Sequence, residues 1–188
     1  LFSLITGEQA GGVWTQTSGT GGTFNAGAGT YTPAVGATTS TFTYTLTGVA
    51  PCINDTSVAT ININPQPVAG TDGAIAICDG STAPIDLFSL ITGEQAGGVW
   101  TQTSGTGGTF NAGAGTYTPA VGATTSTFTY TLTGVAPCIN DTSVATININ
   151  PAPNAGTDGN TTICDSSVTP INLFSLITGE QAGGVWTQ

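Results

Sequence analysis

Alternating apolar and polar residues along the chain predict short β-strands. The segment TFTYTLT (127–133) places Phe128, Tyr130 and Leu132 on one side and threonines on the other. This period of two is typical of a half-buried antiparallel strand. SVATININ (143–150) alternates in the same way, so we expect the intervening GVAPCIND to join the two strands as a hairpin.

The rest of this region also predicts strands. GAIAIC (73–78) is expected as a first strand, and GVWTQT (98–103) and GTFNAGAGTYT (108–118) as middle strands with glycines at turns or bulges. PIDLFSLIT (84–92) fits either a buried strand or a helical turn; we interpret it as a strand because it is short and Gly93 closes it. Six or seven short strands in about 85 residues are typical of an all-β chain folded as a small β-sandwich.

The pattern repeats. LFSLITGEQAGGVWTQ starts at Leu1, Leu87 and Leu173, so its copies are 86 residues apart, and residues 1–65 are identical to residues 87–151. This period is longer than the 20 to 50 residues of solenoid units and falls within the size range of small domains. We therefore expect each period to form one domain.

Two Pro-x-Pro motifs, PQP (65–67) and PAP (151–153), predict short linkers between the copies, because proline fixes φ and removes a backbone donor. The expected domains are a partial repeat over 1–66 that lacks its first strand, a complete repeat over 67–151, and a partial repeat over 152–188 with N-terminal strands only. Since both ends fall inside a repeat, we expect the chain to be a segment of a longer polymer of repeats.

Charge narrows the possible partners. The chain has no Lys, Arg or His and ten acidic residues, for a formal charge of −10. Without cations it cannot neutralise phosphates, which argues against nucleic acid and anionic lipid as partners. No apolar run approaches the length of a membrane span, so membrane insertion is not expected.

Catalytic chemistry is not expected either. No His or Lys can serve as the base of a triad or a Ser-Lys pair. The acidic candidates are not spaced to place two carboxylates in one cleft; they are Asp72, Asp79, Asp86 and Glu94. We therefore predict that the protein is not an enzyme and needs no cofactor.

Calcium at the seams between repeats is the one metal alternative. Asp72 and Asp158 lie beside the linkers, and Asp79 and Asp165 follow the cysteines. Calcium takes six to eight oxygen ligands, commonly from several carboxylates. About one acid per cluster is few for such a site.

Each period carries two cysteines: Cys52 and Cys78, then Cys138 and Cys164. In this composition they predict disulfides. Pairing Cys78 with Cys138 stays inside one domain and is preferred, which would leave Cys52 and Cys164 to pair with cysteines outside the chain. The alternative, Cys52 with Cys78, crosses a linker and requires the chain to double back, because a disulfide needs Cα atoms within about 7 Å.

The order Cys78, Trp100, Cys138 resembles the Cys, Trp, Cys order of immunoglobulin domains. Trp100 is expected in the core together with Phe128 and Tyr130. The motifs AGTDG, PIDLFSLITGEQAGGVW, TFTYTLTGVAPC and SVATININP are similar to the immunoglobulin-like repeats of giant secreted surface proteins of Bacteroidota, including gliding-motility adhesins exported by the type IX system.

That resemblance implies an extracellular filament or adhesin stalk on the bacterial cell surface, made of tandem immunoglobulin-like β-sandwiches. The partners it implies are neighbouring identical repeats, and it implies Cys78 and Cys138 as a structural pair. An alternative function is a glycan- or ice-binding module that uses a threonine face, formed by Thr127, Thr129, Thr131 and Thr133.

Overall fold

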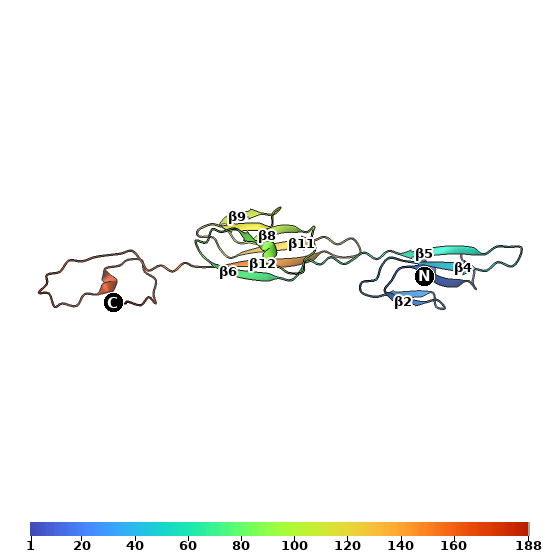
Figure 1. Ribbon diagram of the computed structural model, residues 1–188, viewed down its shortest axis with the longest axis horizontal. Helices are drawn as coiled ribbons and strands as arrows, with labels where there is room; N and C mark the ends of the chain where they lie inside the picture. Colours follow the sequence, from blue (N-terminus) through green and yellow to red (C-terminus); the bar gives the residue numbers. More distant parts are fainter. Residues whose placement is uncertain (188) are drawn as a thin grey trace. The chain divides into compact units, whose positions relative to one another are not determined.

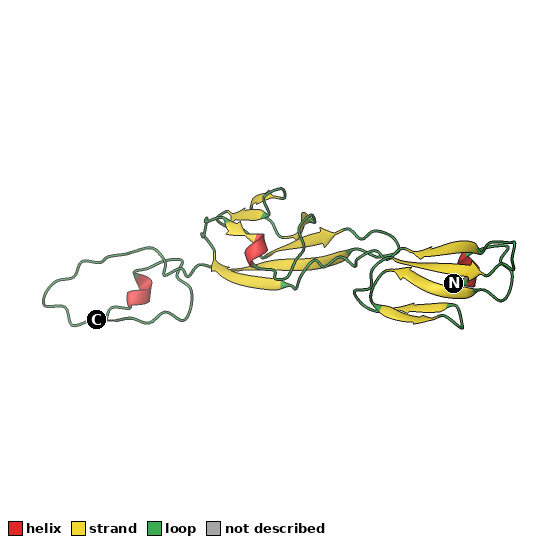
Figure 2. Cartoon of the chain, turned by 45° about the vertical axis from the view of Figure 1, so that its right-hand side comes forward, coloured by secondary structure: helices red, strands yellow, loops and turns green. Residues whose placement is uncertain are grey.

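The computed structural model describes residues 1–187, and Gln188 lies outside the described residues. The chain forms two compact units. Unit 1 comprises Leu1–Gly70, Gly93–Gly98 and Thr131–Thr142, and unit 2 comprises Thr71–Thr92, Val99–Tyr130 and Ser143–Gln188. The regular structure of residues 1–187 consists of β-strands and three short 3-10 helices, with no α-helix (Figure 1, Figure 2). The protein is therefore all-β, as the alternation predicts.

Unit 1 holds the strands of the first copy. They are β1 (Val13–Ser18), β2 (Gly22–Asn25), β3 (Thr30–Pro33), β4 (Ser40–Leu46) and β5 (Asp55–Ile61), preceded by the 3-10 helix η1 (Phe2–Leu4). β4 lies between β1 and β5 in an antiparallel sheet, and β2 and β3 form a separate hairpin. The buried face of the three-stranded sheet carries Trp14, Phe42, Tyr44 and Ala59, and Phe24 and Tyr31 of the hairpin pack against it.

The strands that follow belong wholly or mainly to unit 2. They are β6 (Gly73–Cys78), β7 (Ile85–Asp86), β8 (Val99–Ser104), β9 (Gly108–Asn111), β10 (Thr116–Pro119), β11 (Ser126–Leu132) and β12 (Asp141–Asn150), with the 3-10 helices η2 (Leu87–Ser89) and η3 (Leu173–Ser175). One sheet has the order β6-β12-β11-β8 and the other β7-β10-β9.

Aromatic side chains join these two sheets. The ring centroid of Phe128 on β11 lies 5.0 Å from that of Phe110 on β9 and 4.9 Å from that of Tyr117 on β10. Trp100 on β8 packs against Tyr130 at 5.2 Å. Phe128, Tyr130 and Trp100 are all buried, so the inward side chains of the strands close one core between the sheets.

β6 pairs with β12 in parallel. The register runs from Ala145 opposite Gly73 to Asn150 opposite Cys78. The alternate residues Ala145 and Ile147 are fully buried, which places the apolar stripe of SVATININ on the core side, as its period predicts. Cys78 and Asn150 therefore lie side by side at the ends of their strands.

One expected strand differs from the prediction. PIDLFSLIT is not a strand over 84–92: β7 has two residues, and the chain then enters η2. The Asp86 side chain accepts a hydrogen bond from the backbone N–H of Phe88 at 3.0 Å, and this cap favours a helical turn over continued pairing. GTFNAGAGTYT forms two strands, β9 and β10, paired as a hairpin, and its glycine-rich middle makes the turn, in agreement with the expected glycine turns.

The elements recur with the sequence. β1 to β4 have counterparts of the same length 86 residues later in β8 to β11. β5 ends at Ile61, whereas its counterpart β12 continues to Asn150, the residue that corresponds to Asn64. The extra residues of β12 lie in its pairing with β6, and the first copy has no counterpart of β6 within this chain.

Candidate functional site: the linker-docking groove

A pocket of about 320 Å³ in unit 1 marks the first candidate site. Its lining residues are Thr6, Gly7, Glu8, Gln9, Tyr44, Leu46, Asp55, Thr56 and Ser57. The Tyr44 hydroxyl fixes the backbone from Gln9 to Gly12. It donates a hydrogen bond to the carbonyl oxygen of Gln9 at 2.7 Å and accepts one from the N–H of Gly12 at 2.8 Å. The pocket is lined mainly by polar groups and backbone.

In the second copy, the positions that correspond to Gln9 and Asp55 are Gln95 and Asp141, and they bind the two residues that directly follow the Pro-x-Pro linker. The backbone N–H of Val68 donates to Gln95 Oε1 at 3.0 Å, and the N–H of Gln95 donates to the carbonyl oxygen of Val68 at 2.9 Å. The N–H of Ala69 donates to Asp141 Oδ2 at 2.8 Å, and Ala69 is fully buried. All four residues belong to unit 1. We call the surface formed by Gln95 and Asp141, which corresponds to part of the pocket of the first copy, the linker-docking groove.

The third copy repeats this arrangement within unit 2. The N–H of Asn154 donates to Gln181 Oε1 at 3.1 Å, and the N–H of Gln181 donates to the carbonyl oxygen of Asn154 at 2.9 Å. Asn154 and Gln181 correspond to Val68 and Gln95. Because the shared pair of hydrogen bonds uses the backbone of this residue, it forms with either Val or Asn at the position.

A second attachment in unit 1 joins the end of the first copy to the loop GVAPC (134–138) of the second copy. Asn64 Nδ2 donates to the carbonyl oxygens of Ala136 at 2.7 Å and Val135 at 3.4 Å. The thiol of Cys138 donates to the carbonyl oxygen of Asn64 at 3.3 Å. The loop itself is closed by the bond from the Cys138 N–H to the Val135 carbonyl oxygen at 3.0 Å. The residues that flank the Pro-x-Pro motif, Asn64 before it and Val68 after it, are thus both hydrogen-bonded to the second copy.

Sequence reasoning missed these contacts. It identified the linker by its prolines and did not identify Asn64, Gln95 or Asp141 as its partners. No signal in the sequence distinguishes Gln95. It lies in the repeated phrase GEQAGG, but every residue of that phrase recurs between near-identical copies, so recurrence does not single it out.

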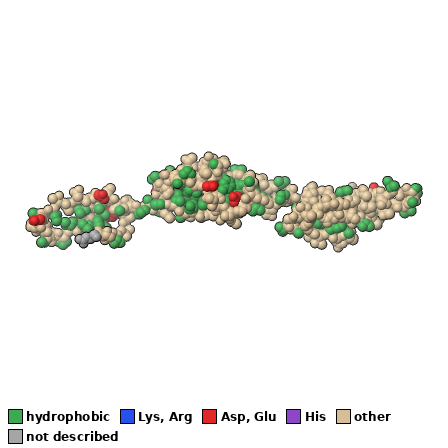
Figure 3. Space-filling view, viewed as in Figure 1, with side chains coloured by type: hydrophobic (Ala, Val, Ile, Leu, Met, Phe, Trp, Pro, Cys, Tyr) green, Lys and Arg blue, Asp and Glu red, His purple; other side chains and the backbone are tan. Residues whose placement is uncertain are grey.

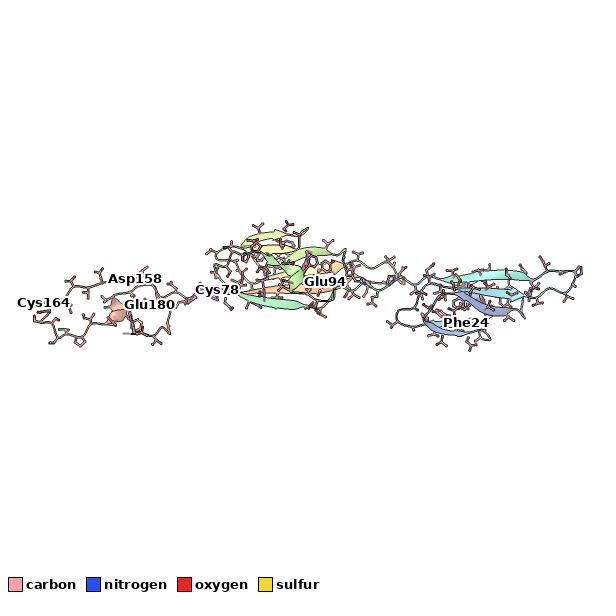
Figure 4. All side chains as sticks on the ribbon, viewed as in Figure 1. Phe24, Cys78, Glu94, Asp158, Cys164 and Glu180 are labelled. Carbon is pink, nitrogen blue, oxygen red and sulfur yellow. The ribbon has the colours of Figure 1, made fainter. Side chains whose placement is uncertain are left out.

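Two of the four acidic residues considered for calcium, Asp72 and Asp79, act as acceptors for backbone N–H groups. Asp72 Oδ1 accepts from the N–H of Val144 at 2.8 Å, and Asp79 Oδ1 accepts from the N–H of Gly122 at 2.8 Å. In residues 1–187, no group of three or more His, Cys, Asp and Glu side chains could hold a metal ion. Figure 4 labels Asp158, the calcium candidate beside the second linker, together with Glu180 of the same copy.

The expected Cys78–Cys138 disulfide is not formed, because all four cysteines are free thiols. The pairing of β6 with β12 explains why. Cys78 lies opposite Asn150, the last residue of β12, whereas Cys138 precedes the first residue, Asp141, by three positions. Ten strand residues span about 30 Å, far more than a disulfide bridges. The alternative pair, Cys52 with Cys78, is not formed either.

Cys164 of the third copy has a distinct environment. It is exposed, and the hydroxyl of Ser166 lies 3.6 Å from its sulfur. Hydrogen bonds from the Ser166 side chain and backbone lower the pKa of the Cys164 thiol below its usual value, because they stabilise the thiolate. The corresponding neighbour of Cys78 is Gly80, which has no hydroxyl.

A second pocket, of about 140 Å³, lies in the third copy and is largely apolar. Phe174, Ile177 and Trp186 line it. Their counterparts 86 residues earlier are Phe88, Ile91 and Trp100, and the last two are buried in the core of the second copy. The pocket therefore corresponds to core surface that later strands of a repeat would cover.

The surface offers little else for chemistry. The face drawn in Figure 3 carries a few separate acidic side chains. On β11, the Thr127 hydroxyl is bonded to those of Thr103 at 2.9 Å and Ser104 at 2.7 Å, so part of the threonine face is bonded to itself. None of the helices described in residues 1–187 is long and apolar enough to cross a membrane.

A comparison of the chain with protein-family models and with curated proteins finds no match.

Proposed function

We propose that this chain is a segment of an extracellular filament or adhesin stalk on a bacterial cell surface, in which tandem immunoglobulin-like repeats act as spacers without catalytic activity. The partners are neighbouring identical repeats of the same polypeptide or filament. Surface adhesion or gliding would be performed by the assembly and by parts of the protein outside these repeats.

The strand order of the second copy supports the immunoglobulin-like assignment. When its seven strands are lettered A to G in chain order, one sheet reads A-G-F-C and the other B-E-D. Immunoglobulin domains likewise divide G, F and C from B, E and D. The buried Trp100 lies on the third strand, which is strand C, the position of the core tryptophan in that fold.

The observation that carries the spacer function is the linker-docking groove. In two copies the backbone that directly follows the Pro-x-Pro motif is held by the same pair of hydrogen bonds to a glutamine, Gln95 in one and Gln181 in the other. In the second copy Asp141 and the fully buried Ala69 add to this attachment. On the other side of the Pro-x-Pro motif, Asn64 of the first copy is hydrogen-bonded to Ala136 of the second copy. A linker held on both sides restricts bending between repeats, which a spacer requires and a flexible tether does not.

Electron microscopy of the native assembly tests this function. We expect filaments with an axial repeat of about 35–45 Å per copy, from strands of seven to nine residues plus a short connector. Cell-surface labelling with an antibody against the repeat should decorate these filaments along their length. Discrete globular particles, or label confined to the cytoplasm, would overturn it.

A second candidate is binding of glycans or ice through the threonine face of β11. Thr127 and Thr129 share one side of that strand, and Thr101 and Thr103 of β8 donate to their carbonyl oxygens at 3.4 Å for Thr129 and 3.2 Å for Thr127. This row of hydroxyl and methyl groups is the feature that favours it. Thermal hysteresis in a freezing assay, lost in Thr129→Asp and kept in Asp158→Asn, would support the ice-binding function, and no hysteresis would exclude it.

A further inference from the structure

The thiol of Cys138 lies at the end of the preceding copy. It donates to the carbonyl oxygen of Asn64 at 3.3 Å, and the same asparagine holds the loop through Ala136. Cys138 is half-buried, whereas Cys52, in the same sequence GVAPC, is exposed. The difference is consistent with Cys138 being covered by the segment that contains Asn64.

Cys78, the cysteine that ends the first strand of the second copy, lies at the end of that copy, beside the residue that corresponds to Asn64 in the first copy. Cys78 is paired with Asn150, and the N–H of the following residue, Asp79, donates to the Asn150 carbonyl oxygen at 2.7 Å. Asn150 corresponds to Asn64. The Asn64 carbonyl oxygen therefore accepts a hydrogen bond from Cys138, the loop cysteine of the following copy. The corresponding oxygen, that of Asn150, accepts one from Asp79, the residue after the first-strand cysteine.

Because the copies are nearly identical, both contacts are expected around the same asparagine at each junction between two repeats of a tandem array. From these contacts we propose that the cysteine ending the first strand of one repeat forms a disulfide with the GVAPC cysteine of the next repeat. The inference rests on the tandem array of the proposed function. Neighbouring strands lie about 4.8 Å apart, so a first-strand cysteine beside Asn64 would be within reach of Cys138 for a disulfide.

This pairing accounts for the free thiols of the present chain. Cys138 would bond to the counterpart of Cys78 one repeat earlier, and Cys78 to the counterpart of Cys138 one repeat later; neither counterpart is within these residues. Each repeat would then be bonded to both of its neighbours, so the seam would be covalently bridged beside the linker.

Formation of the bond is an oxidation that needs a small-molecule disulfide as oxidant. The two thiols lose two electrons and two protons as the S–S bond forms, and the oxidant takes them up to become two thiols. No other group of the protein takes part. The bond is consistent with an extracellular location, where disulfides persist.

The test uses this chain lengthened at its N-terminus by a second copy of residues 67–86, which adds the missing first strand and its cysteine. The chain is incubated with glutathione disulfide, free thiols are alkylated, and a non-reduced digest is analysed by mass spectrometry. We expect one linked peptide pair, between the added cysteine and Cys138, with Cys52, Cys78 and Cys164 alkylated.

Matched variants check the assignment. Cys138→Ser should leave the added cysteine alkylated, and Cys52→Ser should leave the linked pair intact. Full alkylation of Cys138, or its linkage to Cys78, would overturn the proposal, as would amide exchange showing that the added segment does not protect residues 58–64. Native filaments whose cysteines are free thiols would overturn the disulfide and leave the filament function standing. Repeats that are disulfide-linked but form only globular particles would overturn the filament function and leave the disulfide standing.

Discussion

The carboxylate of Asp72 accepts a hydrogen bond from the backbone N–H of Val144 at 2.8 Å. Asp72 immediately precedes β6, and Val144 immediately precedes Ala145, the first residue of β12 that pairs with β6. The side chain thus continues the parallel ladder by one bond, and it also accepts from the Ser143 hydroxyl at 3.3 Å. An acid that the sequence suggested for calcium instead fixes the register of the first strand.

We predict that Asp72→Ala destabilises the second copy by about 1–3 kcal/mol, because it leaves the Val144 N–H and the buried Ser143 hydroxyl without their acceptor. The measurement is urea unfolding, together with amide exchange of β6. The matched control is Asp158→Ala at the corresponding position of the third copy, where the chain contains no counterpart of β12 to lose. Equal effects of the two substitutions would contradict this role.

Gly105 and Gly97 test how much of the fold depends on close backbone approach. Both have positive φ, 91° and 102°. A Cβ on Gly105 would lie 2.6 Å from the Cα of the buried Ser126, whereas nothing lies within 4 Å of one on Gly97. We expect Gly97→Ala to cost about 1 kcal/mol from backbone strain alone, and Gly105→Ala about 3 kcal/mol, because overpacking is added. Thermal unfolding of both variants measures the difference, and similar melting temperatures would contradict it.

The sequence predicts strands well where one face alternates without exception. β6 matches the predicted range 73–78, and β11 and β12 match within one or two residues. The prediction fails at PIDLFSLIT, because its apolar pattern fits both a buried strand and a helical turn. The hydrogen bond from the Phe88 N–H to the Asp86 side chain selects the turn. The parallel pairing of β6 with β12 was also beyond reach, because it joins residues more than 70 positions apart.

That missed pairing explains the wrong disulfide. Sequence separation suggested that Cys78 and Cys138 could meet if the first strand ended near the final hairpin. The parallel register instead carries Cys78 to the far end of β12, beside Asn150. The groove was missed for a related reason, because its partners for the linker, Gln95 and Asp141, are distant in sequence and ordinary in type.

Asn64 provides a third prediction, on the attachment of the GVAPC loop. Asn64→Ala removes the bonds from Nδ2 to the carbonyl oxygens of Ala136 and Val135, so we expect faster amide exchange in residues 133–140. The matched control is Asn150→Ala, at the corresponding position of the second copy, which should leave that loop unchanged. Exchange in the loop that is the same in Asn64→Ala as in the unmodified chain would show that the asparagine does not hold it.

Cys164 gives the last prediction, on thiol reactivity. Hydrogen bonds from Ser166 lower the pKa of the Cys164 thiol, so at a given pH near neutrality more of it is thiolate, the form that reacts with alkylating agents. Ser166→Gly, which copies the Gly80 environment of Cys78, should move the pH profile of Cys164 alkylation to higher pH and slow the reaction near neutrality. Cys78, followed by mass spectrometry in the same samples, should keep its profile. If the Cys164 profiles of the variant and the unmodified chain coincide, the serine does not activate this thiol, and oxidative pairing at this position would have to proceed without its help.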